Sequence, residues 1–584
     1  VIFAIDGLKQ DTLWNYLLHS EKQPGGLHDL LGADTSNGHL QFTKAIAAQQ
    51  GVTVFPSYTY PAWTSAFTGV YPGAHGITGN SVFFRNRGVV RYYTDFHADA
   101  VKVQLERDML AYDINPRTKT LYQYLDERGG QSIVVHNMVV EGSERGRGVR
   151  KPSFDTLWSY QRNQSLAVDE NTLWESVQSL KDFNRDNPGP LRLPTAMTIY
   201  FSGLDHAEHL YPDDPERGRL EYLNQLDRLI AKFLRGASSI PRHHYPVPTA
   251  EQAVERDVLQ WEGLEQAEIF QRTLFVVLSD HGHTPIDWNT AVGIEDLRLM
   301  FEELSHRRKR AYHVETPVLI NESWWSKVRA AMGLFKSDTV SRKTDVVATL
   351  NGGALGLHLK PPNDEWDHRP DFSTDIVPVL EHILLTLHKN RLGPQAVFYN
   401  TGDRYVLIPY RYDQTAITLL PAQPITENTF SPSEYPLAIE RLEGLARQLP
   451  SDPMSAPDLI FLADRSRQLT FVNHQDDRVL DGLDLRTRRH FHADHGHLNG
   501  ADSFVPILFR VGGYTGDRPL SMICQARVSD LTPTVLDVLG LQDMFDTALR
   551  DYPVQMKGKS LKSLAAKVLA EKGGNSDLPC PTNP

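Results

Sequence analysis

Residues Phe55 to Asn80 read FPSYTYPAWTSAFTGVYPGAHGITGN, and the rest of the chain is interpreted around them. Thr59 stands between Pro56 and Pro61, and the small residues that follow favour a helical turn, so we expect its hydroxyl just ahead of a helix N-terminus. Unpaired N–H groups and the positive end of the helix dipole favour an anion there. A hydroxyl becomes a useful nucleophile only when a base or a metal ion removes its proton. The alternative is an ordinary turn in which Thr59 is a cap.

The composition limits the class of protein. With 584 residues, 40% of them hydrophobic and 23% charged, we expect a globular chain with a large core and one or two smaller lobes. The formal net charge of -12 argues against nonspecific binding to a nucleic-acid polymer or to anionic lipid. No apolar run approaches the roughly 18 to 20 residues of a transmembrane helix. We therefore expect a soluble chain that captures any phosphate locally, in a small substrate.

The two ends of the chain carry further expectations. The sequence starts with Val1 rather than Met, and its first residues look like a core strand, so we expect that an upstream segment has been removed and that the protein is secreted or periplasmic. Cys524 and Cys580 are too few for a disulfide framework or a Cys-based metal site, but they can form one bridge. Residues 573–584 are expected to be a flexible tail.

Several buried strands are expected to end in polar side chains. The apolar run VIFAIDG leads to Asp6, the run TAMTIYF leads to Asp205 and His209, and the run TLFVVL leads to Asp280 and His281. Helical stretches such as TKTLYQYLDER alternate with these runs, which predicts an α/β fold with a mostly parallel sheet sandwiched by helices. Because open α/β sheets place their sites at the carboxyl ends of the strands, these side chains are expected to meet.

The same side chains have the chemistry of metal ligands. Asp205 and His209 are four residues apart, so both lie on one face of a helical turn. Asp280 and His281 are costly to bury unless a partner such as a divalent cation satisfies them. The stretch HFHADHGHLNG offers His495 as a further ligand, although a His-rich exposed loop is the alternative. We expect His283 to line the site or to bond a ligand carboxylate rather than to ligate.

From about Asp287 to Ala456 the sequence changes character, with charged helical stretches and the glycine-broken run TDVVATLNGGALGLHLK (Thr344 to Lys360). We read it as an inserted α+β lobe and expect the core to resume with APDLIFLAD. The expected layout is a catalytic core of residues 1–286 and 457–572, a cap-like lobe of residues 287–456 and the tail. The cap would cover the cleft and set substrate choice, with Trp324 or Tyr399 as a wall of the pocket. A peripheral lobe for stability or oligomerisation is the alternative.

The ordered pieces AIDG, FPSYTYP, TGVYPGAHGITGN, SGLDHAEH, SDHGH and ADHGH resemble the alkaline phosphatase superfamily, most closely its nucleotide pyrophosphatase/phosphodiesterase (type I phosphodiesterase) branch. The resemblance covers roughly residues 1–285 and 457–545, and it implies an alkaline-phosphatase-like fold. Ala62 departs from the pattern, since many members carry a polar residue there. The resemblance maps the family's site onto Asp6, Thr59, Asn80, Asp205, His209, Asp280, His281 and His495.

By this resemblance the chain is a hydrolase of phosphodiesters or nucleotide pyrophosphates. Thr59 would be the nucleophile that forms a phosphothreonine, and Asn80 would bind a phosphoryl oxygen. Two Zn²⁺ are implied, with Mn²⁺ or Fe as alternatives. One would be held by Asp6, Thr59, Asp280 and His281, and the other by Asp205, His209 and His495.

Other functions remain open on the sequence alone. The same superfamily includes phosphonoacetate-like C–P hydrolases, and a phosphoryl-alcohol transferase would use similar residues. A metal-braced binding protein without turnover is the non-enzymatic alternative. A sulfatase is disfavoured because the sequence has no C-x-P-x-R stretch for a formylglycine. The oligomeric state stays open.

Overall fold

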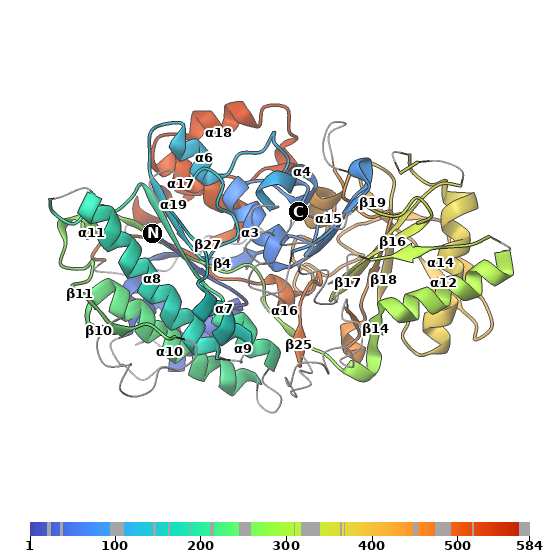
Figure 1. Cartoon of the computed structure of the whole chain (residues 1–584), viewed down its shortest axis with the longest axis horizontal. Coiled ribbons are helices and arrows are strands. Elements are labelled where there is room, and N and C mark those ends of the chain that lie inside the picture. The colour runs from blue at the N-terminus through green and yellow to red at the C-terminus, as the bar shows by residue number, and fades with distance from the viewer. Residues whose placement is uncertain are drawn as a thin grey trace.

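An eight-stranded sheet with the order β27-β4-β26-β12-β1-β9-β7-β8 forms the centre of the first lobe in the computed structural model (Figure 1). Its strands are β1 (Ile2–Ile5), β4 (Ile46–Val52), β7 (Ser132–Val135), β8 (Val149–Arg150), β9 (Ala196–Phe201), β12 (Leu274–Leu278), β26 (Ile507–Val511) and β27 (Ile523–Arg527). The structure describes residues 1–19, 25–35, 39–93, 110–143, 148–161, 164–186, 189–210, 215–244, 258–308, 310–316, 339–362, 365–366, 368–447, 454–472, 492–516 and 519–570.

The first sheet is mostly parallel. β1 pairs parallel with β9 and β12, β7 pairs parallel with β8 and β9, and β27 pairs parallel with β4. Only β26 among these strands runs antiparallel, between β12 and β4. The predicted α/β fold with a mostly parallel sheet is therefore confirmed.

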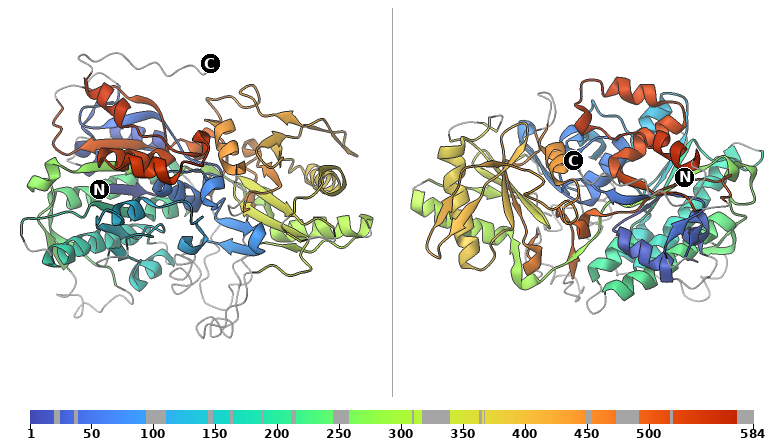
Figure 2. Two further views of the ribbon diagram at one scale, coloured as in Figure 1. Left: turned by 90° about the horizontal axis from the view of Figure 1, so that it is seen from above. Right: turned by 180° about the vertical axis from the view of Figure 1, so that it is seen from behind.

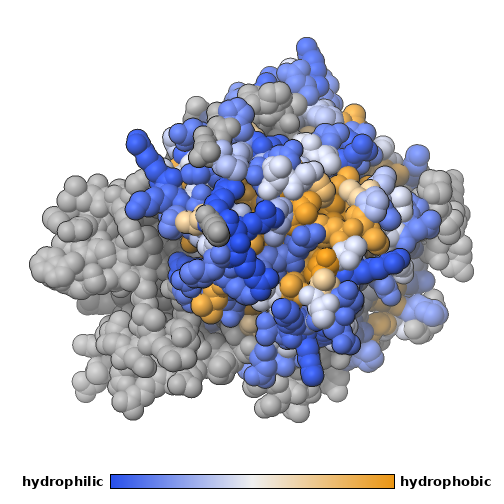
Figure 3. Space-filling model, turned by 90° about the vertical axis from the view of Figure 1, so that its right-hand side faces the viewer, coloured by the Kyte–Doolittle hydropathy of each residue, from blue (hydrophilic) through white to orange (hydrophobic). Residues whose placement is uncertain are grey.

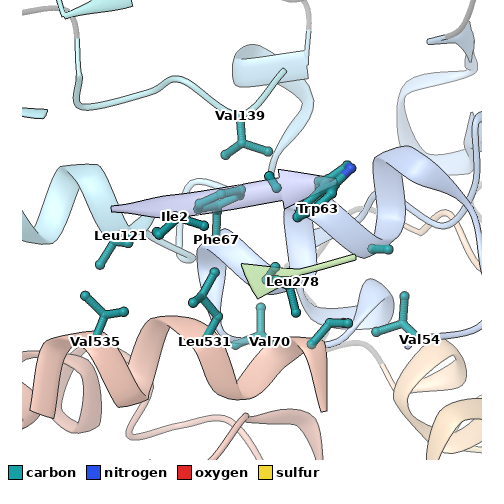
Figure 4. Packing of buried hydrophobic residues seen from close by; sticks show 14 of the residues in the cluster. Ile2, Val54, Trp63, Phe67, Val70, Leu121, Val139, Leu278, Leu531 and Val535 are labelled. Carbon is teal, nitrogen blue, oxygen red and sulfur yellow. The ribbon is translucent and has the colours of Figure 1, made fainter. Parts of the chain in front are cut away.

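Alternate residues of β1 face opposite sides of the sheet, and each side is covered by helices. Ile2 and Ala4 lie in a core with Trp63 and Phe67 of α3, and Figure 4 shows Leu531 and Val535 of α17 packed below them. Phe3 and Ile5 lie in the other core, with α1, α2, α8 and α10. These helices are α1 (Gln10–His19), α2 (Gly26–Leu31), α3 (Thr59–Thr68), α6 (Leu121–Asp126), α8 (Ser165–Asp186), α10 (Pro215–Arg235), α17 (Leu531–Val538), α18 (Gln542–Ala548) and α19 (Lys562–Ala570).

A seven-stranded sheet with the order β15-β16-β17-β23-β18-β19-β22 forms the second lobe (Figures 1 and 2). Its strands are β15 (Val314–Glu315), β16 (Val346–Asn351), β17 (Ala354–Leu359), β18 (Ala396–Asn400), β19 (Tyr405–Leu407), β22 (Gln423–Pro424) and β23 (Leu459–Leu462). Side chains of α12 (Ile294–Arg308) and α14 (Val377–Lys389) share its core. On the face drawn in Figure 3, hydrophilic side chains surround a hydrophobic area.

Shorter elements complete the chain. The helices are α4 (Pro72–His75), α7 (Phe154–Gln161), α9 (Gly203–Leu210), α11 (Glu268–Gln271), α15 (Ala438–Ala446) and α16 (Gly500–Ser503). The paired strands are β2 (Ala33–Asp34) with β3 (Gln41–Phe42), β5 (Ser81–Phe84) with β6 (Val89–Tyr92), β10 (Ala237–Pro241) with β11 (Val258–Trp261), β13 (Thr284–Pro285) with β25 (Ala493–Asp494), β14 (Ala291–Gly293) with β24 (Thr470–Val472), and β20 (Tyr410–Tyr412) with β21 (Ile417–Leu419).

One expectation about the second lobe is wrong. We expected Ala456–Asp464 to return to the catalytic sheet, but β23 lies in the second sheet, between β17 and β18. All four residues of this strand are buried. Such an apolar run fits the centre of either sheet, so its sequence does not say which one it joins. The boundaries of the domains themselves stay a prediction.

Three further expectations concern the ends of the chain and the insert. Among the described residues, we find no helix that is both long and apolar enough to span a membrane. Cys524 is disulfide-bonded, whereas Cys580 and the expected tail lie outside the described residues. Trp324 also lies outside them, and Tyr399 is half-buried beside Phe372, with the two ring centroids 4.7 Å apart.

A buried ion pair joins the two lobes. Arg85, directly after β5 in the first lobe, pairs with Asp458, directly before β23 in the second. Both side chains are almost fully buried. The guanidinium also donates to the carbonyl oxygens of Leu359 and His368, at 3.1 and 2.8 Å. Removing one member of such a pair leaves the other charge buried without its partner.

We therefore predict that Arg85→Met lowers the free energy of unfolding by about 3–5 kcal/mol, because Asp458 loses its counter-charge inside the protein. Urea denaturation measures the change. Arg298→Met is the control, since the ion pair of Arg298 with Glu295 is exposed and such pairs contribute about 0–1 kcal/mol. Equal stability of the two variants would show that the Arg85 pair does not hold the lobes together.

Candidate active site

The carboxyl ends of three neighbouring strands carry the candidate ligands. Asp6 follows β1, Asp280 follows β12, and Asp205 lies in the first turn of α9, directly after β9. Because β1 pairs parallel with both other strands, their ends lie at the same edge of the sheet. The predicted convergence of these three carboxylates therefore has a simple topological cause.

A first group of possible metal ligands consists of Asp6, Asp280 and His281, whose ligand atoms all lie within 4.8 Å of one another. His281 Nε2 is 3.4 Å from Asp6 Oδ1 and 3.4 Å from Asp280 Oδ2. The hydroxyl of Thr59, the first residue of α3, lies 3.1 Å from the same nitrogen. The structure thus brings together the four residues that the sequence assigned to one metal.

The hydrogen bonds of this group fit a cation. Tyr200 donates to Asp6 Oδ2, and Gly7 N donates to Asp280 Oδ1 at 3.1 Å. The other oxygens, Asp6 Oδ1 and Asp280 Oδ2, are buried without a hydrogen-bond partner. Burial, with the neighbouring Asp280 and Asp205, raises the pKa of Asp6 well above its usual range. A divalent cation would satisfy both oxygens and relieve this repulsion.

A second group consists of Asp205, His281, His283 and His495, again within 4.8 Å. His495 Nε2 lies 3.9 Å from Asp205 Oδ1, and its ring stacks on His281 with the centroids 3.7 Å apart. Asp205 Oδ1 is a third buried carboxylate oxygen, and its close neighbours are ring nitrogens of histidines. Burial lowers the pKa of His281 and of His495, which favours the neutral imidazole that binds metals.

His209 lies next to this second group. Its Nε2 is 3.5 Å from Asp205 Oδ1, while its Nδ1 is 2.8 Å from the carbonyl oxygen of Ala493. The carbonyl selects the tautomer in which Nδ1 carries the proton, so Nε2 is the atom available to a metal. The predicted spacing of four residues does bring Asp205 and His209 together on α9.

His283 contacts two carboxylates. Its Nε2 lies 2.9 Å from Asp205 Oδ1, and its Nδ1 lies 2.8 Å from Glu208 Oε2. Burial alone would lower the pKa of His283, but Glu208 and Asp205 outweigh it and raise the pKa to about 10. Glu208 in turn pairs with Arg219 at 3.0 Å. The sequence motifs do not single out Glu208, although its place three residues after Asp205 puts it on the same side of α9.

Asn80 lies beside the start of α3. Its side-chain oxygen accepts a hydrogen bond from Tyr60 N at 3.1 Å, and the residue is buried. Because the oxygen of the amide accepts this bond, its NH₂ group is left as a donor. The amide lies next to Tyr60, the residue that follows Thr59. A donor at a helix N-terminus is suited to a phosphoryl oxygen.

Residues 1–241 match the family model described as type I phosphodiesterase / nucleotide pyrophosphatase. The similarity to that family covers the first 241 residues of the chain. The matched region contains Asp6, Thr59, Asn80, Asp205 and His209. The resemblance that the motifs indicated is therefore confirmed, and the family is one of phosphodiesterases and nucleotide pyrophosphatases.

Two solved structures of murine ectonucleotide pyrophosphatase / phosphodiesterase 5 are similar to this chain. The first has 11% sequence identity and a TM-score of 0.44, and the match covers 92% of this chain and 94% of that one. The second, an inactive variant in complex with AMP, has 10% identity and a TM-score of 0.46 over the same shares of the two chains. A search of curated proteins found no similar sequence.

We predict that Zn²⁺ stabilises the metal-stripped protein against thermal unfolding, by about 2.7 kcal/mol at 100 times the Kd, because the ion binds the folded carboxylates and imidazoles. Differential scanning calorimetry with and without Zn²⁺ measures the effect. Asp280→Asn should lose most of it, whereas Asp375→Asn, a buried carboxylate of the second lobe, should retain it. Equal stabilisation of all three proteins would place the zinc elsewhere.

Proposed function

We propose that the chain hydrolyses a phosphodiester or a nucleotide pyrophosphate through a phosphothreonine at Thr59. The observation that carries the proposal is the place of the Thr59 hydroxyl. It lies at the start of α3, 3.1 Å from His281 Nε2, beside the carboxylates of Asp6 and Asp280. A nucleophile, an anion-binding helix end and a set of metal ligands are thus adjacent.

Two zinc ions suit the ligands. Asp6, Thr59, Asp280 and His281 would hold one, and Asp205, His209 and His495 would hold the other, since Zn²⁺ prefers imidazole and carboxylate ligands in sets of this size. Mn²⁺ or Fe is the alternative. When bound, such ions supply the positive charge that lowers the pKa of a hydroxyl and of a leaving group.

The chain's own residues carry the remaining steps. The Thr59 oxygen gives up its proton to solvent and attacks phosphorus, so that a bond from Oγ1 to phosphorus forms and the bond to the leaving oxygen breaks. The leaving group departs as an alcohol, or as a phosphate ester from a pyrophosphate, after it takes up a proton. The Asn80 amide donates to a phosphoryl oxygen as charge builds there. Water then hydrolyses the phosphothreonine, releases a phosphomonoester and restores the hydroxyl.

We further propose that the lobe of residues 287–456 serves this site as a cap that sets substrate choice, with Tyr399 as a candidate wall of the pocket. Two facts about the chain order support this role. The lobe begins shortly after His281, and β24, which follows the lobe, precedes His495. The turn between β16 and β17 also contacts the site.

We predict that Thr59→Ala lowers kcat on bis-p-nitrophenyl phosphate by at least about 10³-fold, because no other residue takes the place of the nucleophile. The assay is run with Zn²⁺ added. Thr64→Val is the matched control, since Thr64 lies on the same helix, is fully buried and should leave turnover unchanged. Activity of Thr59→Ala within tenfold of the wild type would rule out the assignment.

A panel of substrates tests the type of reaction. We expect the wild-type protein to cleave a nucleotide diester and a nucleotide pyrophosphate faster than a phosphomonoester or phosphonoacetate, as measured by kcat/KM under identical conditions. A phosphonoacetate rate well above the diester rate would favour a C–P hydrolase. The absence of turnover on every substrate, in a folded and zinc-loaded protein, would favour a metal-braced binding protein.

A further inference from the structure

A tight turn of the second lobe touches the candidate active site of the first. This turn, Asn351-Gly352-Gly353, joins β16 to β17 and lies within the glycine-broken run noted in the sequence. We call it the NGG turn. Asn351 is only 4% exposed, so its amide group must find its partners inside the protein.

The side chain of Asn351 holds the backbone on both sides of Asn80. Ser81 N donates to Asn351 Oδ1 at 3.0 Å, and Asn351 Nδ2 donates to the carbonyl oxygen of Ser81 at 3.4 Å. On the other side, a Cβ added at Gly79 would lie 2.6 Å from Asn351 Nδ2, so only a glycine allows this approach. One side chain thus hydrogen-bonds the residue after Asn80 and lies close against the residue before it.

The two glycines of the turn hold the segment of His495. Gly353 N donates to the carbonyl oxygen of His495 at 2.8 Å. A Cβ added at Gly352, whose φ is +49°, would lie 2.3 Å from the same oxygen. A Cβ at Gly496 would lie 2.5 Å from the carbonyl oxygen of Asn351 and 2.3 Å from the ring of Tyr58. The backbone of the turn and the backbone around His495 are thus in direct contact.

Tyr58 connects the segment of His495 to Thr59. It directly precedes Thr59, its ring centroid lies 4.1 Å from that of His495, and its hydroxyl donates to Asp494 Oδ1 at 3.3 Å. The NGG turn thus borders the segments that carry Asn80 and His495, and Tyr58 connects the second of these to the segment of Thr59.

The turn is itself held firmly in the second lobe. Gly352 exchanges two backbone hydrogen bonds with Phe471, at 3.0 and 2.8 Å, and Ala463 N donates to the carbonyl oxygen of Gly353 at 2.9 Å. Because the turn is bonded to both lobes, it fixes the position of one relative to the other.

We propose that the NGG turn is a positioning element, which sets Asn80 and His495 in place relative to Thr59, so that the second lobe supplies part of the scaffold of the site. The roles of Asn80 and His495 rest on the proposed function. Displacements of about 1 Å at such groups cost about 10²-fold in rate, and mutations beside metal ligands cost about 10- to 100-fold in metal affinity.

The first experiment tests whether Asn351 positions Asn80. Asn351→Ala should lower kcat on bis-p-nitrophenyl phosphate by about 10- to 100-fold, while Zn²⁺ affinity stays within threefold of the wild type. The matched control is Asn400→Ala. Asn400 is equally buried in the same sheet, and its amide bonds two backbone groups, Gly402 N at 2.9 Å and the carbonyl oxygen of Pro457 at 3.2 Å. The control should lose comparable thermal stability and keep its kcat.

The second experiment tests whether the turn positions His495, and it measures Zn²⁺ binding rather than catalytic turnover. Gly352→Ala should lower the affinity for Zn²⁺ by about 10-fold or more, measured by competition with a chromophoric chelator, because the added methyl group pushes against the His495 carbonyl. Its control is Gly402→Ala. Gly402 also has a positive φ, +116°, but a Cβ there meets nothing closer than 3.9 Å. The control thus carries backbone strain without contact to the site.

The outcomes separate the two proposals. A kcat for Asn351→Ala within threefold of Asn400→Ala, or a Zn²⁺ affinity of Gly352→Ala equal to that of Gly402→Ala, would overturn the positioning role and leave the turn a part of the fold only. If the wild type cleaves no diester, the proposed function fails, and the chelator competition still decides whether the turn positions His495.

Discussion

The fold holds three carboxylates, those of Asp6, Asp205 and Asp280, close together and out of water. Bringing such groups together inside a protein opposes folding, because each loses hydration and repels the others. The chain satisfies one oxygen of Asp6 through Tyr200 and one of Asp280 through Gly7 N, while a second oxygen of each remains without a hydrogen-bond partner. The uncompensated negative charge that results favours a cation at this place.

Both lobes contact segments that carry residues of the candidate site. The parallel strands of the first lobe carry the candidate ligands to one edge of the sheet, and α3 brings the hydroxyl of Thr59 to them. The second lobe is not a loosely attached addition, because Arg85 and Asp458 bury opposite charges at the junction and the NGG turn meets the backbone at Ser81 and at His495. The two lobes are therefore packed against each other beside the candidate site.

The sequence predicted the parts of this structure that local pattern determines. Apolar runs ending in Asp or His revealed three strands of the first sheet, and the spacing of Asp205 and His209 placed both on one helical turn. Local pattern could not place β23, whose four apolar residues suit either sheet, nor show that β26 runs antiparallel. It also could not reveal the contact of Asn351 with Ser81 or the pairing of His283 with Glu208, because both depend on how distant segments pack.

β26 is a central strand of the first sheet that is synthesised late. This strand, Ile507–Val511, lies between β12 and β4, and among the described strands it alone connects β4 to those that carry the metal-ligand candidates. The ribosome releases it only after the whole second lobe has emerged. Until then β4, and with it the segment leading to Thr59, has no neighbour in the sheet, since β27 follows later still. A nascent or clipped chain that stops before β26 therefore contains every residue from Asp6 to His495 and still lacks the strand that brings Thr59 to them.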